Sequence, residues 1–484
     1  MIDTICAIST PAGVGGMAVA RLSGPKAKEI ALRLMPACAD LVPRHATLAS
    51  LRKVASQGHG ELIDEGVVTF FQAPASYTGE DVVEIACHGS QYVQQILIEC
   101  LIGLGARIAK PGEFTRRAFM NGRLNLSQAE AVADLIDSVN AVGHQLAISQ
   151  LRGGYSQGLS ALRTQLLDLT SLLELELDFS EEDVEFANRR QLTDIVDTIL
   201  AKVNSLCEGF RMGNAIKGGV PVAIVGRPNV GKSTLLNALL KEDRAIVSNR
   251  PGTTRDVIED TLTLQGICFR IIDTAGLRHS GDAVEQEGMA RSIQAARRAQ
   301  IVLYVVDAKQ STEQITQELD ALGGQVPLDG KILLLVCNKA DTLCADAICP
   351  DGKETSHNQC QECGSLPYAN EGSPLSPKDE FPPTFQVSAK YGNGIALVEQ
   401  ALVDTVRRQL PQDGVLVTNA RHYEALTHIR TALSQVKEGL HNRLPADLVS
   451  IDLRDALHYL GEITGEVTTE EVLGNIFSRF CVGK

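Results

Sequence analysis

Residues 226–234 read Gly-Arg-Pro-Asn-Val-Gly-Lys-Ser-Thr and directly follow the apolar run from Pro221 to Val225. A strand, a glycine-rich turn and an apolar helix in this order are typical of a P-loop. The glycines let backbone N–H groups close around the β- and γ-phosphates of a nucleotide, Lys232 offsets their charge and the Ser233 hydroxyl reaches Mg²⁺. We therefore expect a nucleoside triphosphate site on an α/β domain. Further contacts to the nucleotide are expected from Asn229, Val230, Gly231 and Thr234.

The base of the nucleotide is predicted by motifs further along the chain. Asn338-Lys339-Ala340-Asp341 ends the apolar run from Ile332 to Cys337. The Asp341 carboxylate matches the N1–H and exocyclic amine of guanine, whereas adenine offers no such pair of donors. Ser388-Ala389-Lys390 follows a later short strand at 385–387 and is expected to close the base pocket. These motifs predict GTP as the ligand, with Asn338, Lys339, Asp341, Ser388 and Ala389 at the base.

Two loops between these motifs are expected to contact the γ-phosphate and Mg²⁺. Asp273-Thr274-Ala275-Gly276 ends a predicted hairpin of 260–264 with 268–272. Asp273 can hold Mg²⁺ through water, and the Gly276 N–H can contact the γ-phosphate. Pro251-Gly252-Thr253-Thr254-Arg255-Asp256 is the second loop, in which Thr254 is the expected second hydroxyl on Mg²⁺.

The catalytic machinery departs from that of many small GTPases. The residue after Asp-x-x-Gly is Leu277, which cannot orient the attacking water as the usual Gln does. Glu285 is our candidate to position the attacking water, acting through a water, and Lys232 is a second expected catalytic residue. The alternative is that Glu285 is an ordinary solvated acid. The sequence reveals no arginine finger, and a monovalent cation bound near Asn229 would substitute for its charge.

The flanks of the nucleotide-binding segment predict two further domains. Residues 1–120 alternate short strands (17–22, 66–71 and 81–86) with helices (26–34 and 92–101), which indicates a small α/β or α+β domain. Residues 121–217 and 411–484 show helical periodicity, and the second stretch is too short for a core of its own. We expect them to pack together as one helical domain, with a Ras-like G domain at 218–410 inserted between them.

Local patterns within the helical stretches are specific enough to test. Ser127-Gln128-Ala129-Glu130 matches a capping box and predicts that a helix begins there. Three apolar stripes at helical spacing predict buried faces: Tyr155, Leu159, Leu162, Leu166, Leu169 and Leu173; Leu192, Val196, Ile199, Val203 and Leu206; and Ala425, Ile429, Leu433, Val436 and Leu440.

Composition limits the partners of the chain. Its 45 Lys and Arg face 59 Asp and Glu, and the net charge of −14 argues against a broad basic surface that coats nucleic acid. No apolar run approaches the about 18 residues of a membrane span, and no secretory or transit segment is evident, so a cytoplasmic protein without a membrane partner is expected. The 12 Cys occur in core-like contexts, which favours reduced thiols over a disulfide framework.

Both ends of the chain resemble the family of tRNA-modifying GTPases called MnmE or TrmE. The first part carries Arg21-Leu22-Ser23-Gly24, Ser76-Tyr77-Thr78-Gly79-Glu80-Asp81 and Pro111-Gly112-Glu113-Phe114-Thr115. The last part carries Asn419-Ala420-Arg421-His422, Glu462-Ile463-Thr464-Gly465-Glu466 and a terminal Cys481-x-Gly-Lys484, the most specific match. Together with the GTP motifs, the resemblance covers nearly the full length.

This resemblance implies a specific set of ligands. G domains of the family dimerise across the nucleotide face when K⁺ is bound, and K⁺ would be held by Asn229 and by oxygens from about Ser248, Arg250 and Thr253. Ser248 and Thr253 would thereby also contact GTP, and Glu285 falls on the family's catalytic Glu. The N-terminal domain would bind a tetrahydrofolate derivative, either 5-formyl- or 5,10-methylene-tetrahydrofolate, and support a constitutive homodimer. The matching folate positions are Arg21, Glu84, Arg123 and Lys484, with Arg123 standing where the family often has Lys.

The resemblance also implies partners and a reaction. The family acts with a flavoprotein, MnmG, in a heterotetramer that places an aminomethyl or carboxymethylaminomethyl group on C5 of the wobble uridine of certain tRNAs. The flavin and much of the basic RNA surface would belong to that partner, which reconciles a tRNA substrate with the acidic chain. Cys481 is either a nucleophile or a tail residue lining the folate site.

Two rival functions and one insertion stay open. A ribosome-assembly GTPase that binds RNA would share the G motifs, and a folate methyltransferase with a vestigial G domain would share the ends. Residues 342–384 form a long insertion that is either a zinc site or a loop without metal. Its candidate ligands are Cys344, Cys349, His357, Cys360 and Cys363.

Overall fold

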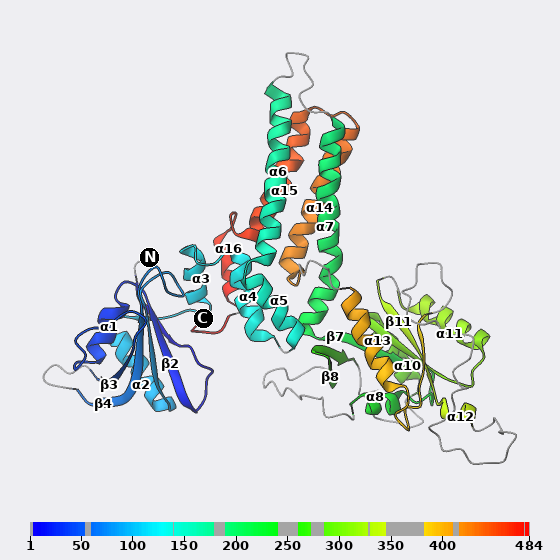
Figure 1. Cartoon of the computed structure of the whole chain (residues 1–484), viewed down its shortest axis with the longest axis horizontal. Helices are drawn as coiled ribbons and strands as arrows, with labels where there is room; N and C mark the ends of the chain where they lie inside the picture. Colours follow the sequence, from blue (N-terminus) through cyan, green and yellow to red (C-terminus); the bar gives the residue numbers. More distant parts are fainter. Residues whose placement is uncertain are drawn as a thin grey trace. The chain divides into compact units, whose positions relative to one another are not determined.

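The computed structural model describes residues 3–53, 60–138, 140–178, 189–240, 260–272, 285–327, 330–344, 382–409, 416–478 and 480–483, with the backbone alone at 175–178, 285–290, 344 and 471. These residues divide into two compact units (Figure 1). The first comprises Met1–Asp137, Ala147–Val203 and Glu424–Lys484, and the second comprises Ser138–Leu146 and Asn204–Tyr423. The domain limits expected from the sequence stay predictions. Of the Cys and His of the insertion, Cys349, His357, Cys360 and Cys363 lie outside the described residues, as does the side chain of Cys344.

The first unit contains a six-stranded sheet in the order β3-β4-β5-β2-β1-β6. All neighbours pair antiparallel except β1 and β6, which are parallel. The predicted strands overlap β2, β4 and β5, while β1, β3 and β6 were not predicted. The strands are β1 Ile5–Ile8, β2 Gly15–Ser23, β3 Ala46–Arg52, β4 Leu62–Phe71, β5 Val82–Gly89 and β6 Arg107–Ile108.

Two helices, α1 (Ala27–Leu34) and α2 (Gln91–Gly103), bury their apolar residues against one face of this sheet. Alternate strand residues Ala18, Ala20 and Leu22 point into the same core, because successive side chains of a strand face opposite sides. Arg21, between two of these core positions, consequently lies on the opposite face. α1 and α2 thus cover one face of the sheet, and the other face carries Arg21 beside a smaller buried cluster of Ile5, Ala7, Ala109 and Phe114.

Long helices form the rest of the first unit. α6 (Gly154–Asp178) packs against α15 (Ala446–Thr464), so the two helical stretches flanking the nucleotide-binding segment pack together as expected (Figure 1). The predicted stripes are buried, except that Leu206 is partly buried and Cys207 takes the core position. The other helices here are α3 Glu113–Met120, α4 Leu126–Asp137, α5 Ala141–Leu151, α7 Arg189–Gly218, α14 Ala420–His441 and α16 Glu470–Phe477, of which α5, α7 and α14 continue into the second unit.

The capping box predicted at Ser127 was wrong by two residues. α4 begins at Leu126, and the residue before it, Asn125, accepts a hydrogen bond from the Gln128 N–H at 2.8 Å. The Gln128 side chain in turn accepts from the Asn125 N–H at 3.0 Å, which completes a reciprocal cap. Ser127 lies inside the helix, where its hydroxyl donates to the Asn125 side chain. Asn caps as well as Ser does, so the pattern alone had two solutions.

The second unit contains a six-stranded sheet in the order β12-β11-β10-β7-β9-β8, parallel except for the predicted hairpin of β8 with β9. Its strands are β7 Val220–Val225, β8 Asp260–Leu264, β9 Ile267–Ile271, β10 Ile301–Asp307, β11 Ile332–Asn338 and β12 Thr384–Gln386. α8 (Lys232–Leu240) and α13 (Ile395–Arg408) cover one face, while α10 (Glu285–Arg298) and α11 (Thr312–Gln325) cover the other. A short helix, α12 (Asp341–Cys344), follows β11.

Two whole-chain expectations can be compared with the described residues. Among the described helices, none combines the length and the apolar character needed to cross a bilayer. The described cysteines are free thiols; Cys6, Cys87, Cys207 and Cys268 are buried, and Cys481 is exposed. Burial raises the pKa of the Cys87 thiol to about 11, which keeps it protonated and unreactive.

Candidate functional site

The P-loop connects the C-terminal end of β7 to the first turn of α8. Gly226 has φ +150°, and a Cβ there would lie 2.2 Å from the Val305 carbonyl oxygen of β10. Gly231 has φ +95°, and its Cβ would lie 2.2 Å from the Asn338 side-chain nitrogen. Both positions therefore require glycine, for backbone conformation and for space. Asn229, at φ +63°, is exposed in the same turn.

Lys232 lies across the P-loop. Its ammonium donates to the carbonyl oxygens of Gly226 at 2.9 Å and Arg227 at 2.7 Å. Burial lowers the pKa of Lys232, because desolvation disfavours its charged form. A phosphate group would offset that cost, and the backbone N–H groups at the start of α8 would favour the same anion.

Asn338, at the end of β11, joins the P-loop to the predicted base pocket. Its side chain is buried, donates to the Val230 carbonyl at 2.9 Å and accepts from the Ala389 N–H at 3.0 Å. One amide side chain thus fixes the P-loop and the Ser388-Ala389 segment at a common point. A residue without both a donor and an acceptor cannot replace it.

Asp341 and Lys339 flank this junction. The Ser388 hydroxyl donates to Asp341 Oδ1 at 2.5 Å, which orients the carboxylate beside the segment expected to close the pocket. Lys339 has φ +63°, and its ammonium pairs with Asp307 Oδ2 of β10 at 2.9 Å. Burial alone would raise the pKa of Asp307, but hydrogen bonds from Lys339 and the Lys309 N–H lower it. Asp307 therefore stays ionised and holds Lys339.

Part of the predicted nucleotide site lies outside the described residues. These positions are Ser248, Arg250, Thr253, Thr254, Asp273, Thr274, Ala275 and Gly276. Glu285 is the first residue of α10, but its side chain is also outside the description. Ser233 and Thr234 occupy the first turn of α8, directly after Lys232. Ser233 lies one residue beyond Lys232, where a hydroxyl can reach a cation beside the phosphates.

A second polar site lies in the first unit, on the face of the sheet opposite α1 and α2. Arg21 of β2 and Glu84 of β5 are direct cross-strand partners. The guanidinium contacts the same Glu84 oxygen through Nε at 2.9 Å and Nη2 at 2.8 Å. The rings of Tyr77 and Phe114 lie 5.3 and 5.7 Å from the guanidinium carbon. Cation–π contact and ion pairing together fix the orientation of Arg21.

The C-terminal tail reaches this pair. The Gly483 carbonyl accepts from Arg21 Nη1 at 3.3 Å and from the Ser9 hydroxyl at 3.2 Å. Gly483 has φ +97°, and a Cβ there would lie 2.3 Å from the Ile8 carbonyl oxygen. The Gly112 N–H donates to the Cys481 carbonyl at 3.4 Å. The tail thus takes part in the Arg21 site through its backbone.

Two further predicted folate-binding residues, Arg123 and Lys484, have no described contact with the Arg21–Glu84 pair. Lys484 lies outside the described residues. Arg123 is exposed, and its side chain packs beside the turn at Gly79. Within the described part of the chain, no hydrogen bond or ion pair joins Arg123 to Arg21 or Glu84. The structure therefore brings Arg21 and Glu84 together with the tail, but it does not bring Arg123 into that pair.

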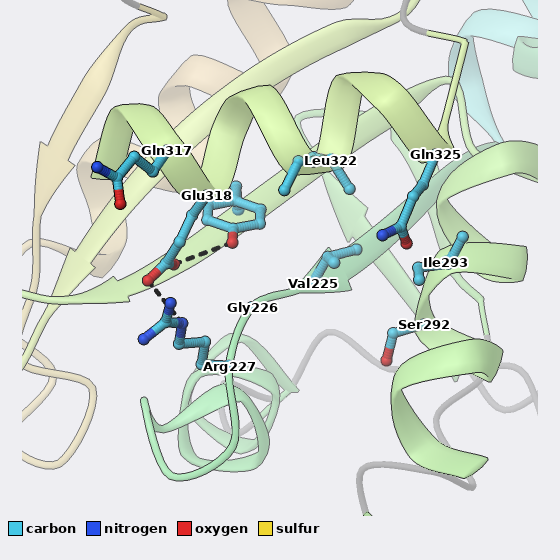
Figure 2. Close-up of a pocket in the computed structure, with 11 residues that line it drawn as sticks. Val225, Gly226, Arg227, Ser292, Ile293, Gln317, Glu318, Leu322 and Gln325 are labelled. Atoms are coloured by element: carbon cyan, nitrogen blue, oxygen red, sulfur yellow. Dashed lines mark hydrogen bonds and ion pairs between the residues drawn. The ribbon is translucent and has the colours of Figure 1, made fainter. Parts of the chain in front are cut away.

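Sequence reasoning missed a polar network beside the P-loop, shown in Figure 2. Arg227 Nε donates to Glu318 Oε1 of α11 at 2.7 Å, and the Tyr304 hydroxyl of β10 donates to Glu318 Oε2 at 3.0 Å. Glu318 is 6% exposed. One signal was available: Glu318 occupies the same buried helix face as Ile315 and Leu322, where an acid is unusual unless it is paired.

Comparison with known proteins covers the whole chain. Residues 4–123 match the model described as "GTP-binding protein TrmE N-terminus", and residues 126–481 match the "MnmE helical domain". The "tRNA modification GTPase MnmE" of Parabacteroides distasonis is 46% identical over 488 residues, covering 100% of both chains. The protein of the same description from Christiangramia forsetii is 45% identical over 492 residues, covering 100% of this chain and 99% of that one.

Several solved structures resemble part of the chain. The G domain of the T. maritima FeoB iron transporter is 22% identical and covers 38% of this chain and 97% of its own, with a TM-score of 0.23. The matches to both family models and the full-length identity to curated relatives assign the chain without that likeness. The chain belongs to the MnmE (TrmE) family of tRNA modification GTPases.

Proposed function

We propose that this chain hydrolyses GTP and thereby drives, together with a flavoprotein partner, a folate-dependent modification at C5 of the wobble uridine of certain tRNAs. The group added is an aminomethyl or carboxymethylaminomethyl group. The observation that carries the GTPase half is the junction made by Asn338, which holds the P-loop carbonyl of Val230 and the Ala389 N–H at once. The phosphate loop and the base pocket are thus preassembled at one edge of the sheet.

In this mechanism the described residues bind and orient the nucleotide. The carboxylate of Asp341 accepts from N1–H and the exocyclic amine of guanine, while the Ser388 hydroxyl donates to Oδ1 of the same carboxylate. Lys232 exchanges its two P-loop carbonyl contacts for phosphate oxygens, which offset the cost of burying its charge. Glu285 positions the attacking water through a second water, since Leu277 cannot do so.

Two cations fit the donor set of this loop. The Ser233 hydroxyl would hold Mg²⁺ with Thr254, and the exposed amide oxygen of Asn229 would hold K⁺ with oxygens of Ser248, Arg250 and Thr253. Hard oxygen donors of this kind suit both ions. Bound there, the cations neutralise charge that develops on the phosphates in the transition state.

The Arg21–Glu84 pair is the proposed folate site. A carboxylate fits the amino and N–H edge of a pterin, while Arg21 is held by Tyr77, Phe114 and the Gly483 carbonyl. The side chains of Arg21 and Glu84 are 18% and 32% exposed, which leaves them accessible to a ligand. Arg123 and Lys484 complete the site in this proposal, and the nearby tail gives Cys481 access to the one-carbon group.

A homodimer follows from the same open face of the sheet. Cross-strand neighbours Leu48, Val67, Ala86 and Val19 form a row on the face that α1 and α2 do not cover. Leu48 is 74% exposed, and nearby Met17 on β2 is 66% exposed. A second copy would remove this apolar surface from water. Its position beside Arg21 and Glu84 would place the folate site next to the subunit boundary.

A flavoprotein partner makes a tRNA substrate compatible with the acidic charge of this chain. At −14, this chain offers little general attraction for tRNA, so the basic RNA surface and the flavin would belong to the partner. Mass spectrometry of wobble nucleosides from cells lacking this chain tests the whole proposal. We expect loss of the C5-modified uridine; an unchanged level would leave the tRNA reading without support and favour a ribosome-assembly GTPase.

Two further measurements separate the halves of the proposal. GTP hydrolysis should be much faster in K⁺ than in Na⁺ at equal ionic strength, and equal rates would remove the monovalent cation from the mechanism. Titration calorimetry with 5-formyl-tetrahydrofolate should detect binding that Glu84→Gln weakens about tenfold, because a charged acceptor becomes a neutral amide. The GTPase rate of that variant should match the native rate.

A further inference from the structure

The network around Glu318 raises a question that burial alone does not answer. Glu318 is a carboxylate on a buried helix face, and such a group is costly unless its oxygens are satisfied. Arg227, Tyr304 and Gln310 each donate to it, with Gln310 Nε2 at 2.9 Å from Oε1. The acid is therefore fully engaged. An apolar residue would fill the same helix position at lower cost, so the carboxylate calls for a role beyond packing.

That role is indicated by the position of Arg227. Arg227 is the second residue of the P-loop, directly after Gly226, and its side chain is 60% exposed. It borders a cavity of about 180 Å³ between α10 and α11, also lined by Ser292, Ile293 and Gln325 (Figure 2). Packing alone does not fix the position of an arginine side chain at the edge of such a cavity. The 2.7 Å contact to Glu318 fixes the position of Arg227.

The network continues to the guanine motif. The Gln310 side chain that donates to Glu318 also accepts from the Asp307 N–H at 3.1 Å. Asp307 in turn holds the ammonium of Lys339 at 2.9 Å. A continuous series of polar contacts thus runs from the P-loop through α11 to the residue next to Asn338. It reaches the nucleotide site by a route separate from the Asn338–Val230 contact.

We propose that Glu318 is a positioning residue which, through Arg227, holds the strand side of the P-loop in the conformation that binds guanine nucleotide. Asn338 holds the helix side of the same loop at Val230. Gln310 ties this support to the Asp307–Lys339 pair. The inference deepens the nucleotide site proposed above and rests on it, because it names the residues that set the geometry of that site.

The test is a double-mutant cycle on the full chain, with the dissociation constant and dissociation rate of fluorescent GDP as readouts. Arg227→Ala and Glu318→Ala should each weaken binding roughly tenfold, as expected for loss of a charge-assisted hydrogen bond. The double variant should bind GDP no more weakly than the single variant with the lower affinity, because the two substitutions remove the same interaction. Gln310→Ala, which leaves the Arg227–Glu318 pair in place, should have a smaller effect of about threefold.

The controls separate positioning from general stability. Gln317→Ala, one position before Glu318 and lining the same cavity, should bind GDP within about twofold of the native chain. If Glu318→Ala fails to fold by circular dichroism, Glu318→Gln replaces it in the cycle, since the amide oxygen still accepts from Tyr304. All affinities are measured well below the unfolding temperature, so a loss of stability alone leaves them unchanged.

The outcomes discriminate between the two proposals. If the native chain does not bind guanine nucleotide, the proposed function is at fault. If the native chain binds and the Glu318 variants bind equally well, the positioning role is wrong and Glu318 serves only the fold. Additive losses in the double variant, near a hundredfold, would also overturn it, because Glu318 would then act independently of Arg227.

Discussion

The two polar sites of this chain are assembled from very different lengths of sequence. In the second unit, Gly231 and Asn338 belong to short motifs that each follow a strand of a parallel sheet. In the first unit, Arg21 meets Glu84 across 63 positions and the Gly483 carbonyl across 462 positions. Both sites use the same elements, an ion pair or amide, a left-handed glycine and a backbone carbonyl. They differ in what brings these elements together.

The comparison teaches how rigid each site should be. The proposed nucleotide site lies at the ends of buried strands, where each motif is held by the sheet on one side and a helix on the other. The Arg21 site depends on a C-terminal tail that contacts it through the Gly483 carbonyl, while the Cys481 carbonyl accepts from the Gly112 N–H. A chain end is ordered only where contacts hold it in place. A substitution of the same kind should therefore have a larger effect on the first site than on the second.

The largest expected effect is at the base pocket. Asp341→Asn replaces the carboxylate proposed to accept two guanine hydrogen bonds with an amide that also donates, so GTP affinity should fall about a thousandfold. Xanthosine nucleotides, which carry a carbonyl in place of the exocyclic amine, should bind the variant better than GTP. Competition with fluorescent GDP measures both. An unchanged preference for guanine would show that Asp341 does not contact the base.

A glycine substitution tests the junction at Asn338. Gly231→Ala places a methyl group 2.2 Å from the Asn338 side-chain nitrogen at φ +95°, so both hydrogen bonds of Asn338 should be disrupted. We expect GTP affinity to fall roughly a hundredfold. Gly324→Ala in α11 is the matched control, because a Cβ there meets nothing within 4 Å. Affinity retained in Gly231→Ala would mean that the P-loop and Asn338 adjust independently.

Substitution of Gly483, the left-handed glycine of the Arg21 site, should have a smaller effect than substitution of Gly231. Gly483→Ala places a methyl group 2.3 Å from the Ile8 carbonyl oxygen, with φ +97°. Because the tail can move away, we expect release of the tail rather than collapse of the unit. Carboxypeptidase should remove the last residues roughly fivefold faster than from the native chain, with GTP affinity unchanged. Equal digestion rates would indicate that Gly483 does not anchor the tail.

The smallest expected effect is the pH dependence of the stability of the first unit. Burial would raise the pKa of Glu113, but hydrogen bonds from Arg107 and the Lys110 N–H, with the charge of Arg117, lower it below its usual 4.5. A carboxylate with a lowered pKa stabilises the fold above pH 4.5, and this contribution is lost as the pH falls through its folded-state value. Ion pairs of partly exposed groups contribute about 0.2–1 kcal/mol to stability, and we expect the loss to fall in that range.

Thermal unfolding of native protein and Glu113→Gln between pH 3 and 7 checks this prediction. The native chain should be the more stable at pH 7, and the difference should shrink as the pH falls below 4.5. Glu29→Gln, an exposed position on α1, serves as the control. A difference that stays constant with pH would assign the effect of Glu113 to packing.

The sequence by itself determined the nucleotide motifs and the α/β class of the segment that carries them. Each motif is a short contiguous segment, and glycines at 226 and 231 encode their own left-handed backbone. Parallel strands end at one edge of a sheet, so Asn338, Asp341 and Ser388 were bound to converge once the strand order was right. Apolar periodicity likewise predicted the buried stripes of α6 and α14.

Only the tertiary structure decided the contacts between distant segments. Strand register placed Arg21 opposite Glu84, and a shift of one residue would have put the two side chains on opposite faces of the sheet. The packing of α11 turned an acid on its apolar face, Glu318, toward Arg227 of the P-loop. The tail reached Arg21 through a backbone carbonyl, which carries no side-chain signature. Local pattern encodes conformation, whereas register and packing depend on the energy of the whole fold.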